Sequence, residues 1–168
     1  MPTREASPAT STNADLVRRA FEAVNRHDAR AASELWSEDA LWRVPEQTIR
    51  GPRQVAAWFE ELFAAMPDVR FDVIAIAAEG PDVFVHWHMA GRHTGRLTGL
   101  DGTGRSIALD GMDHLVVRDG KIAANTIVFD QLESARQVGA LPPLGSRADR
   151  LMTAMLNVRT KLVSSLRR

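Results

Sequence analysis

Asp130 is the carboxylate whose sequence surroundings best suit acid–base chemistry. It follows an apolar stretch, Ile127 to Phe129, that has the composition of a buried strand. Apolar surroundings disfavour the charged form and raise a carboxyl pKa from about 3.9 toward neutral pH. Such a group can remove a proton from an activated C–H bond. Asp also caps helices, and a helix-like segment begins at Gln131, so a general base and a helix N-cap are the two alternatives.

A hairpin supplies further candidates. The strand-like segments 105–118 and 121–129 are separated by Asp119-Gly120. An Asp-Gly pair between two such segments predicts a two-residue turn, in which Arg118 pairs with Lys121.

Counting back from this turn places Asp113 opposite Thr126, and His114 opposite Asn125. Because strand side chains alternate between faces, Asp113, Thr126 and Asp130 are predicted to share one face. Asp113 is then the second carboxylate of a pocket, and two carboxylates in one pocket push their pKa values apart. On this register His114 faces outward, but a β-bulge would change the faces, so both remain candidate partners for Asp130.

Three other histidines could contact a ligand. His86 and His88 lie two residues apart on a strand-like segment and so share a face. Such a pair binds a metal only with a third ligand, and because no metal motif is present we expect none. We expect His88 to donate a hydrogen bond to a substrate carbonyl. His93 follows the strand near the predicted rim, where it either contacts substrate or holds a turn.

Tryptophans are candidate walls for a ligand. Trp42 and Trp87 lie on strand-like segments and Trp58 on a helical one. Aromatic side chains most often belong to the core, but a pocket for a flat, apolar ligand also uses them. Trp42 is the first choice for such a wall.

Hydrophobic periodicity predicts the elements that position these residues. Helical spacing comes first and strand-like alternation follows, an α+β order in which a strongly bent antiparallel sheet wraps around helices as a cone with one open mouth. Gly139 ends the last short helix of the domain, where a left-handed residue is favoured. Helices are predicted over about 14–26, 29–36, 51–65 and 131–138, and strands over 40–44, 69–77, 82–90, 105–118 and 121–129.

The 168 residues suit one domain flanked by two tails. Residues 1–13, rich in Ser, Thr, Pro and Ala, are predicted to be disordered, and residues 14–145 to form the domain. Residues 146–168 carry an apolar stripe among arginines and predict an amphipathic basic helix. That helix packs on the domain or on a partner subunit, and binding to a membrane surface is the alternative.

Composition excludes several functions. The formal net charge is zero, which argues against nucleic-acid binding. No apolar run approaches about 18 residues, so no membrane span is expected. The absence of cysteine excludes disulfides and thiolate chemistry. Without a secretory signal pattern, a cytoplasmic location is expected.

An ordered set of short motifs covers about Asp15 to Pro143. It reads FEAVNRHD, SEDA, Gly51, MPDV, HWHMAGRHTG, TGR, VRDGKI and FDQLESARQVGALPP. Together these motifs resemble the SnoaL-like polyketide cyclases of the nuclear transport factor 2 superfamily. The resemblance implies the cone-shaped α+β barrel, and aldol ring closure without metal or organic cofactor. It also implies that Asp130 is the acid and base.

One position departs from the family. Thr126 stands where related sequences often carry Trp, which implies a wider or more polar pocket and puts a transferred substrate in doubt. We therefore expect a cyclase or isomerase of secondary metabolism, as in antibiotic biosynthesis, acting on a hydrophobic polyketide-like substrate. Epoxide opening, by an Asp113–Asp130 pair, and non-catalytic ligand binding are the alternatives. The fold further implies a homodimer through the outer face of the sheet.

Overall fold

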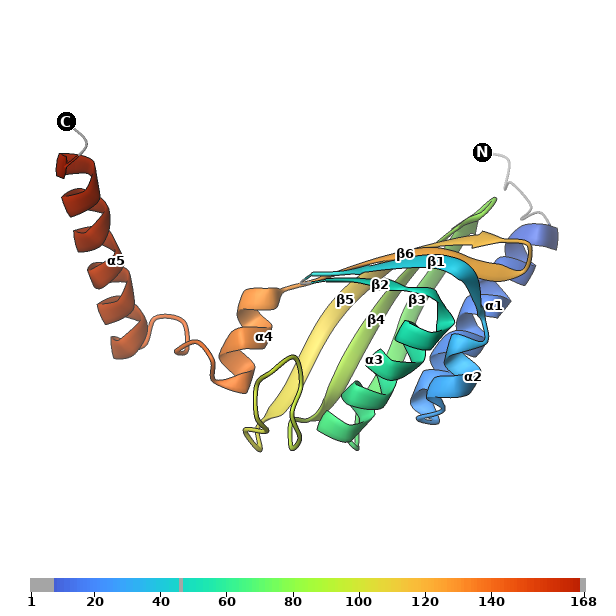
Figure 1. Ribbon diagram of the computed structural model, residues 1–168, viewed down its shortest axis with the longest axis horizontal. Coiled ribbons are helices and arrows are strands. Elements are labelled where there is room, and N and C mark those ends of the chain that lie inside the picture. The colour runs from blue at the N-terminus through green and yellow to red at the C-terminus, as the bar shows by residue number, and fades with distance from the viewer. Residues whose placement is uncertain (1–7, 46, 167–168) are drawn as a thin grey trace.

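The computed structural model describes residues 8–45 and 47–166 and contains one curved sheet with five helices (Figure 1). The strand order is β2-β1-β6-β5-β4-β3, in which β1 and β6 are parallel and the other neighbours antiparallel. The elements are α1 (Pro8–Asn25), α2 (Ala29–Ser33), β1 (Trp36–Val44), β2 (Gln47–Arg50), α3 (Gly51–Ala65), β3 (Arg70–Glu79), β4 (Asp82–Arg92), β5 (Ser106–Arg118), β6 (Lys121–Phe129), α4 (Gln131–Val138) and α5 (Arg147–Leu166).

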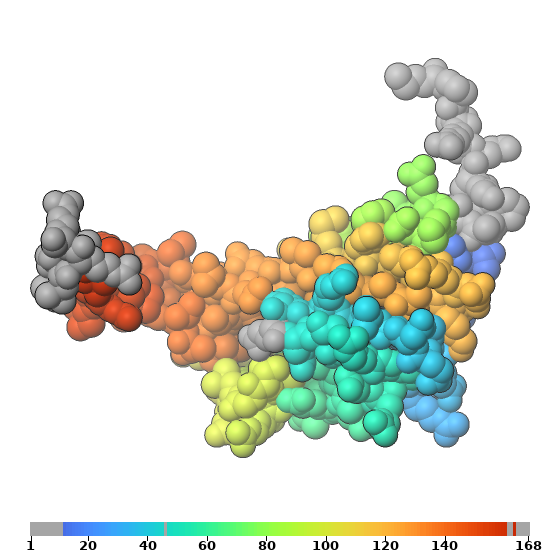
Figure 2. All heavy atoms as spheres, turned by 45° about the horizontal axis from the view of Figure 1, so that its top comes forward, coloured from blue at the N-terminus to red at the C-terminus, as the bar shows by residue number. Residues whose placement is uncertain are grey.

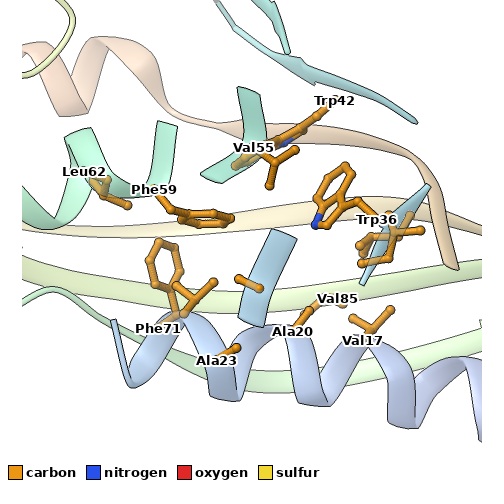
Figure 3. Close-up of a cluster of buried hydrophobic side chains, with 14 of the residues drawn as sticks. Val17, Ala20, Ala23, Trp36, Trp42, Val55, Phe59, Leu62, Phe71 and Val85 are labelled. Atoms are coloured by element: carbon orange, nitrogen blue, oxygen red, sulfur yellow. The ribbon is translucent and has the colours of Figure 1, made fainter. Parts of the chain in front are cut away.

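The core lies between the concave face of the sheet and helices α1 to α3. Helical spacing turns one stripe of each helix inward, with Val17 and Ala20 on α1 and Val55 and Phe59 on α3, and all four are buried. Figure 3 shows these side chains facing Phe71 and other residues of the strands. The predicted α+β cone is confirmed.

Several predicted boundaries coincide with the structure, and others differ from it. The helix at 131–138 and the strand at 121–129 match α4 and β6, and Gly139 adopts the left-handed conformation at φ 87°. The helix predicted to end at Trp36 ends at Ser33, because Trp36 begins β1 and its indole is buried in the core. The short strand β2 was not predicted.

Helix α1 begins earlier than the sequence predicted. It starts at Pro8, so residues 8–13 are helical and their assignment to a disordered tail was wrong. Asn13 lies within this helix, and its side-chain amide donates to the carbonyl of Gly80 at 2.9 Å, which ties α1 to the β3–β4 turn. Residues 1–7 lie outside the described part of the chain.

A β-bulge changes the predicted register of β5 and β6. Arg118 pairs with Lys121 as predicted, but Val116 pairs with Ala124, so one extra residue, Ala123, enters β6. Asp113 therefore lies opposite Ile127, and the prediction that it faces Thr126 was wrong.

The bulge also reassigns the faces of β6. Asn125, Ile127 and Phe129 share the concave side with Asp113, whereas Thr126 and Val128 lie on the convex side. His114 faces outward as the unbulged register predicted, although its partner is Thr126 and not Asn125.

Helix α5 projects away from the body of the domain (Figures 1 and 2). Its apolar side chains Leu151, Met155 and Val158 are each 58–62% exposed, so the helix does not pack on its own domain. The side chains of Leu162 and Leu166, also assigned to the apolar stripe, lie outside the described part. Within the described residues no helix is long and apolar enough to cross a membrane.

Candidate active site

The wide end of the cone holds an apolar cavity of about 410 Å³, here called the main cavity. Its walls come from the concave face of the sheet, from α3 and from α4, whose Ser134, Ala135 and Val138 close one side. The other walls are largely apolar and include Trp58, Leu62, Phe71, Trp87, Met89, Leu97, Ile107, Leu109, Ile127 and Phe129. Such a space suits a hydrophobic ligand of drug-like size.

His93 is the single titratable side chain among the described residues that line the main cavity. It is 1% exposed, and its Nδ1 lies 3.3 Å from the hydroxyl of Thr103 while Nε2 has no partner. Its backbone N–H donates to the carbonyl of Arg105, and its carbonyl accepts from Gly104 N–H. The structure shows the turn-holding role of His93 and places its side chain at the cavity wall, whereas its contact with substrate stays a prediction.

A second, smaller space of about 50 Å³ lies deeper in the cone and is called the inner chamber. Its polar walls are Asp113 and Asn125, and its aromatic walls include Trp42. Four side chains line both spaces and so separate them: Trp58, Phe71, Trp87 and Ile127.

Asp113 is the buried acid of this chamber. Its side chain accepts a 3.2 Å hydrogen bond from Asn125 Nδ2 to Oδ2, whereas Oδ1 has no partner. Burial raises the pKa of Asp113 from 3.8 to about 6, and the hydrogen bond from Asn125 and the nearby indole N–H of Trp87 partly offset that rise. The Trp87 N–H lacks hydrogen-bond geometry to the carboxylate, so its dipole lowers the pKa of Asp113 through space. A carboxyl with a pKa near 6 can both take and return a proton near neutral pH.

Gly111 allows Trp87 to cover this site. The two residues are cross-strand partners, and a Cβ placed on Gly111 would lie 2.2 Å from two ring carbons of Trp87. The indole therefore lies directly over the glycine backbone, between the main cavity and the inner chamber.

Replacing Gly111 by Ala is expected to lower the free energy of unfolding by about 1–3 kcal/mol, the usual cost of overpacking a core. Ala is otherwise favoured over Gly within strands by about 0.5–1 kcal/mol, so a net loss identifies the clash. Chemical denaturation measures it. In a double-mutant cycle, Gly111→Ala should cost less free energy of unfolding in a Trp87→Leu background than in the wild type, because the clashing ring is absent. A Gly111→Ala variant as stable as the wild type would show that the ring does not occupy this position.

Asp130 lies outside both spaces. It is exposed and caps α4, accepting a 2.9 Å hydrogen bond from the backbone N–H of Glu133. Of the two alternatives for this residue, the structure shows the helix cap. Because Asp130 stands on the surface, the Asp113–Asp130 pair expected for epoxide opening is not formed.

Three other candidates lie on the convex face of the sheet. His114 Nε2 lies 2.7 Å from Asp82 Oδ1, and His88 Nδ1 lies 2.9 Å from Asp110 Oδ1. Thr126 is the cross-strand partner of His114. None of the three lines either internal space, so their assignment to the substrate pocket was wrong.

The two tryptophans predicted as ligand walls do line internal space. Trp42 and Trp87 are 3% and 2% exposed, and both line internal space, Trp42 only the inner chamber and Trp87 both. Trp42 packs edge-on against Trp58, with ring centroids 4.7 Å apart.

Asn125 was missed as a site residue because the unbulged register placed it on the convex face. The signal available was a lone amide within an otherwise apolar strand.

A curved sheet that wraps around helices and encloses internal space is the architecture of the nuclear transport factor 2-like fold. A candidate SnoaL-like polyketide cyclase from Jannaschia sp. CCS1 has this fold with a TM-score of 0.76, at 20% identity over 83% of this chain and 100% of that one. AclR, a candidate hydroxylase from Streptomyces galilaeus, gives 0.70 at 22% identity, covering 79% and 99%. Identities this low establish the fold alone.

Sequence comparison defines the family. Residues 14–138 match the family model of the SnoaL-like polyketide cyclases. The chain is also 32% identical over 137 residues to aklanonic acid methyl ester cyclase DnrD from Streptomyces peucetius, covering 77% of this chain and 92% of that protein. The chain therefore belongs to the SnoaL-like polyketide cyclase family, as the motifs predicted, and is one of its enzymes.

Proposed function

We propose that this enzyme closes a ring in a hydrophobic polyketide-like substrate by cofactor-independent aldol chemistry, with Asp113 as the acid and base. The observation that supports the proposal most directly is a buried carboxyl, with its pKa raised to about 6, in an inner chamber that shares four of its walls with the apolar cavity of about 410 Å³. An intramolecular aldol needs a base to remove a C–H proton and an acid to protonate the new alkoxide. One carboxyl can do both in turn, and the ring closure leaves the substrate mass unchanged.

The main cavity supplies orientation. Apolar and aromatic walls exclude water and hold a flat ligand, so that its reacting atoms stay close together. His93 Nε2, unpaired at the cavity wall, is the group we propose to donate a hydrogen bond to a substrate oxygen. The sequence had predicted His88 in this hydrogen-bond donor role.

Conversion of the substrate named for the relative, aklanonic acid methyl ester, tests the function. Purified protein without added metal or cofactor is expected to convert it to a product of equal mass and different retention time in liquid chromatography–mass spectrometry. A panel of related polyketide esters extends the assay if that compound is not turned over. If the protein binds these esters but forms no isomer of any of them, the result would contradict catalysis and favour a binding protein. The proposed setting is the cytoplasm, as the sequence predicted.

The convex face of the sheet supports a homodimer. Phe84, Met112 and Val128 lie on β4, β5 and β6 and are 46%, 56% and 64% exposed. Met112 and Val128 are direct cross-strand partners, so they form one continuous apolar surface. Surfaces of this kind mark contacts between proteins. We propose that a second copy of the chain covers it.

Light scattering should therefore give twice the chain mass for the wild type. Charge repulsion and desolvation at a shared apolar face should make a Met112→Glu, Val128→Glu variant monomeric, with ring closure retained, because neither side chain lines the internal spaces. Leu144→Glu is the matched control, since this leucine is 78% exposed but lies outside the sheet. A wild-type monomer, or a dimer unaffected by both charges, would overturn this arrangement.

A further inference from the structure

We infer that the inner chamber is a binding site for one water molecule, which carries protons between Asp113 and a substrate in the main cavity. The inference rests on the proposed acid–base function of Asp113 and adds the route by which that carboxyl reaches its substrate. It assigns Trp42 and Asn125 as positioning residues.

Four polar atoms without a hydrogen-bond partner belong to side chains that line the inner chamber. Two are donors, the indole N–H groups of Trp42 and Trp87, and two are acceptors, Oδ1 of Asp113 and Oδ1 of Asn125. Each of the four residues is at least nine-tenths buried. A buried polar atom without a partner costs about 1–3 kcal/mol, so four such atoms around one space indicate a polar ligand.

The number and type of these atoms match water. A water molecule accepts two hydrogen bonds and donates two, whereas a carbonyl donates none and a substrate hydroxyl donates one. The chamber offers about 50 Å³ to a water-sized sphere, more than the roughly 10–15 Å³ that one water needs on the same measure. The orientation of Asn125 is fixed because its Nδ2 donates to Asp113 Oδ2, which leaves its Oδ1 as the acceptor.

The position of the chamber requires an intermediary. Asp113 lines the inner chamber and not the main cavity, from which Trp58, Phe71, Trp87 and Ile127 separate it. A direct contact between this carboxylate and a substrate would require one of these side chains to move. A water molecule is small enough to carry the proton between these side chains without displacing them.

The proton transfer balances without any co-reactant. The water first gives up the hydrogen bond from the N–H of Trp87, which lines both spaces, and this frees a lone pair toward the substrate. It then takes the C–H proton of the substrate as it gives one of its own protons to Asp113, which leaves an enolate, a neutral water and a protonated carboxyl. The enolate carbon attacks the substrate carbonyl, and the C–C bond forms as the carbonyl becomes an alkoxide. The reverse relay returns the proton from Asp113 through the water to that alkoxide.

A high-resolution crystal structure of the whole protein without substrate tests the site. One water is expected within hydrogen-bond distance of Asp113 Oδ1 and Asn125 Oδ1, with both indole N–H groups directed at it. NMR of the same protein should show magnetisation transfer from a long-lived water to the indole protons of Trp42 and Trp87. A chamber closed by side chains, or indole protons without such transfer, would overturn the inference.

Trp42→Phe tests the role. It keeps an aromatic ring and removes one donor, so we expect loss of the ordered water and about a tenfold fall in kcat, the effect of losing one hydrogen bond. Phe63→Leu is the control for a lost aromatic contact, because Phe63 lines neither internal space and the water should remain. Full activity in Trp42→Phe beside an inactive Asp113→Asn would refute the relay alone, whereas an active Asp113→Asn would refute the proposed function.

Discussion

Replacing Asp113 by Asn is expected to reduce kcat for ring closure by 10²- to 10⁴-fold, roughly the contribution of one positioned general acid–base group. Asn keeps the shape of the side chain but cannot take a proton at neutral pH. Because the main cavity stays intact, substrate binding should change little, so kcat should fall much more than KM rises. Steady-state kinetics with the ester used above measure both values.

Two matched variants isolate the effect. Asp110→Asn changes a carboxylate on the same strand that faces outward and pairs with His88, so activity should stay near that of the wild type. Asp130→Asn replaces one good helix cap by another, so it should keep both stability and activity. A large loss in Asp130→Asn, with Asp113→Asn still active, would restore the assignment made from the sequence.

The stability of the wild type is expected to fall as the pH rises from 4 to 7, because of the ionisation of Asp113. The pKa of Asp113 is about 6 in the folded protein and 3.8 in its ordinary state, so the folded protein binds more protons than the unfolded chain in this interval. Its contribution to the free energy of unfolding is therefore greatest below pH 4 and decreases as the pH rises through 6. Two pKa units correspond to about 3 kcal/mol at pH 7.

Other carboxylates also titrate in this interval, so the test compares two proteins. Urea unfolding of the wild type and of Asp113→Asn at a series of pH values gives the difference between their free energies of unfolding. That difference should shift in favour of the variant by about 2 kcal/mol from pH 4 to pH 7. A constant difference would mean that Asp113 is not desolvated in the folded state.

The sequence predicted most elements because their signals are local. The turn at Asp119-Gly120 and the stop at Gly139 depend on neighbouring residues alone, and the structure shows both. Trp36 illustrates the limit, because its helical spacing was overridden by burial on the sheet. The contact of Asn13 with Gly80, which ties α1 to the β3–β4 turn, likewise joins residues that are distant in the sequence.

The candidate site was predicted in part. Asp113 was placed inward and His114 outward, as the structure has them, but their partners depended on the register. One inserted residue, Ala123, moves Thr126 to the convex face and Asn125 to the concave one. A bulge is a property of strand pairing and leaves no mark in composition, so the Asp113–Asn125 contact could not be derived from the sequence.

The role of Asp130 could not be decided from sequence either. A carboxylate between an apolar strand and a helix has the same neighbours whether it caps the helix or enters a cavity. The choice depends on where α4 begins relative to the curved sheet, and in the structure the carboxylate meets the N–H of Glu133.

The pH dependence of kcat/KM for wild type and Asp113→Asn tests the central claim most directly, that Asp113 is the acid and base. In the wild type, activity should rise with pH through an apparent pKa near 6, because the base must be ionised. The variant should keep only residual activity without that rise. An unchanged rise in Asp113→Asn would contradict the account and assign the titrating group to another residue, with His93 the first to examine.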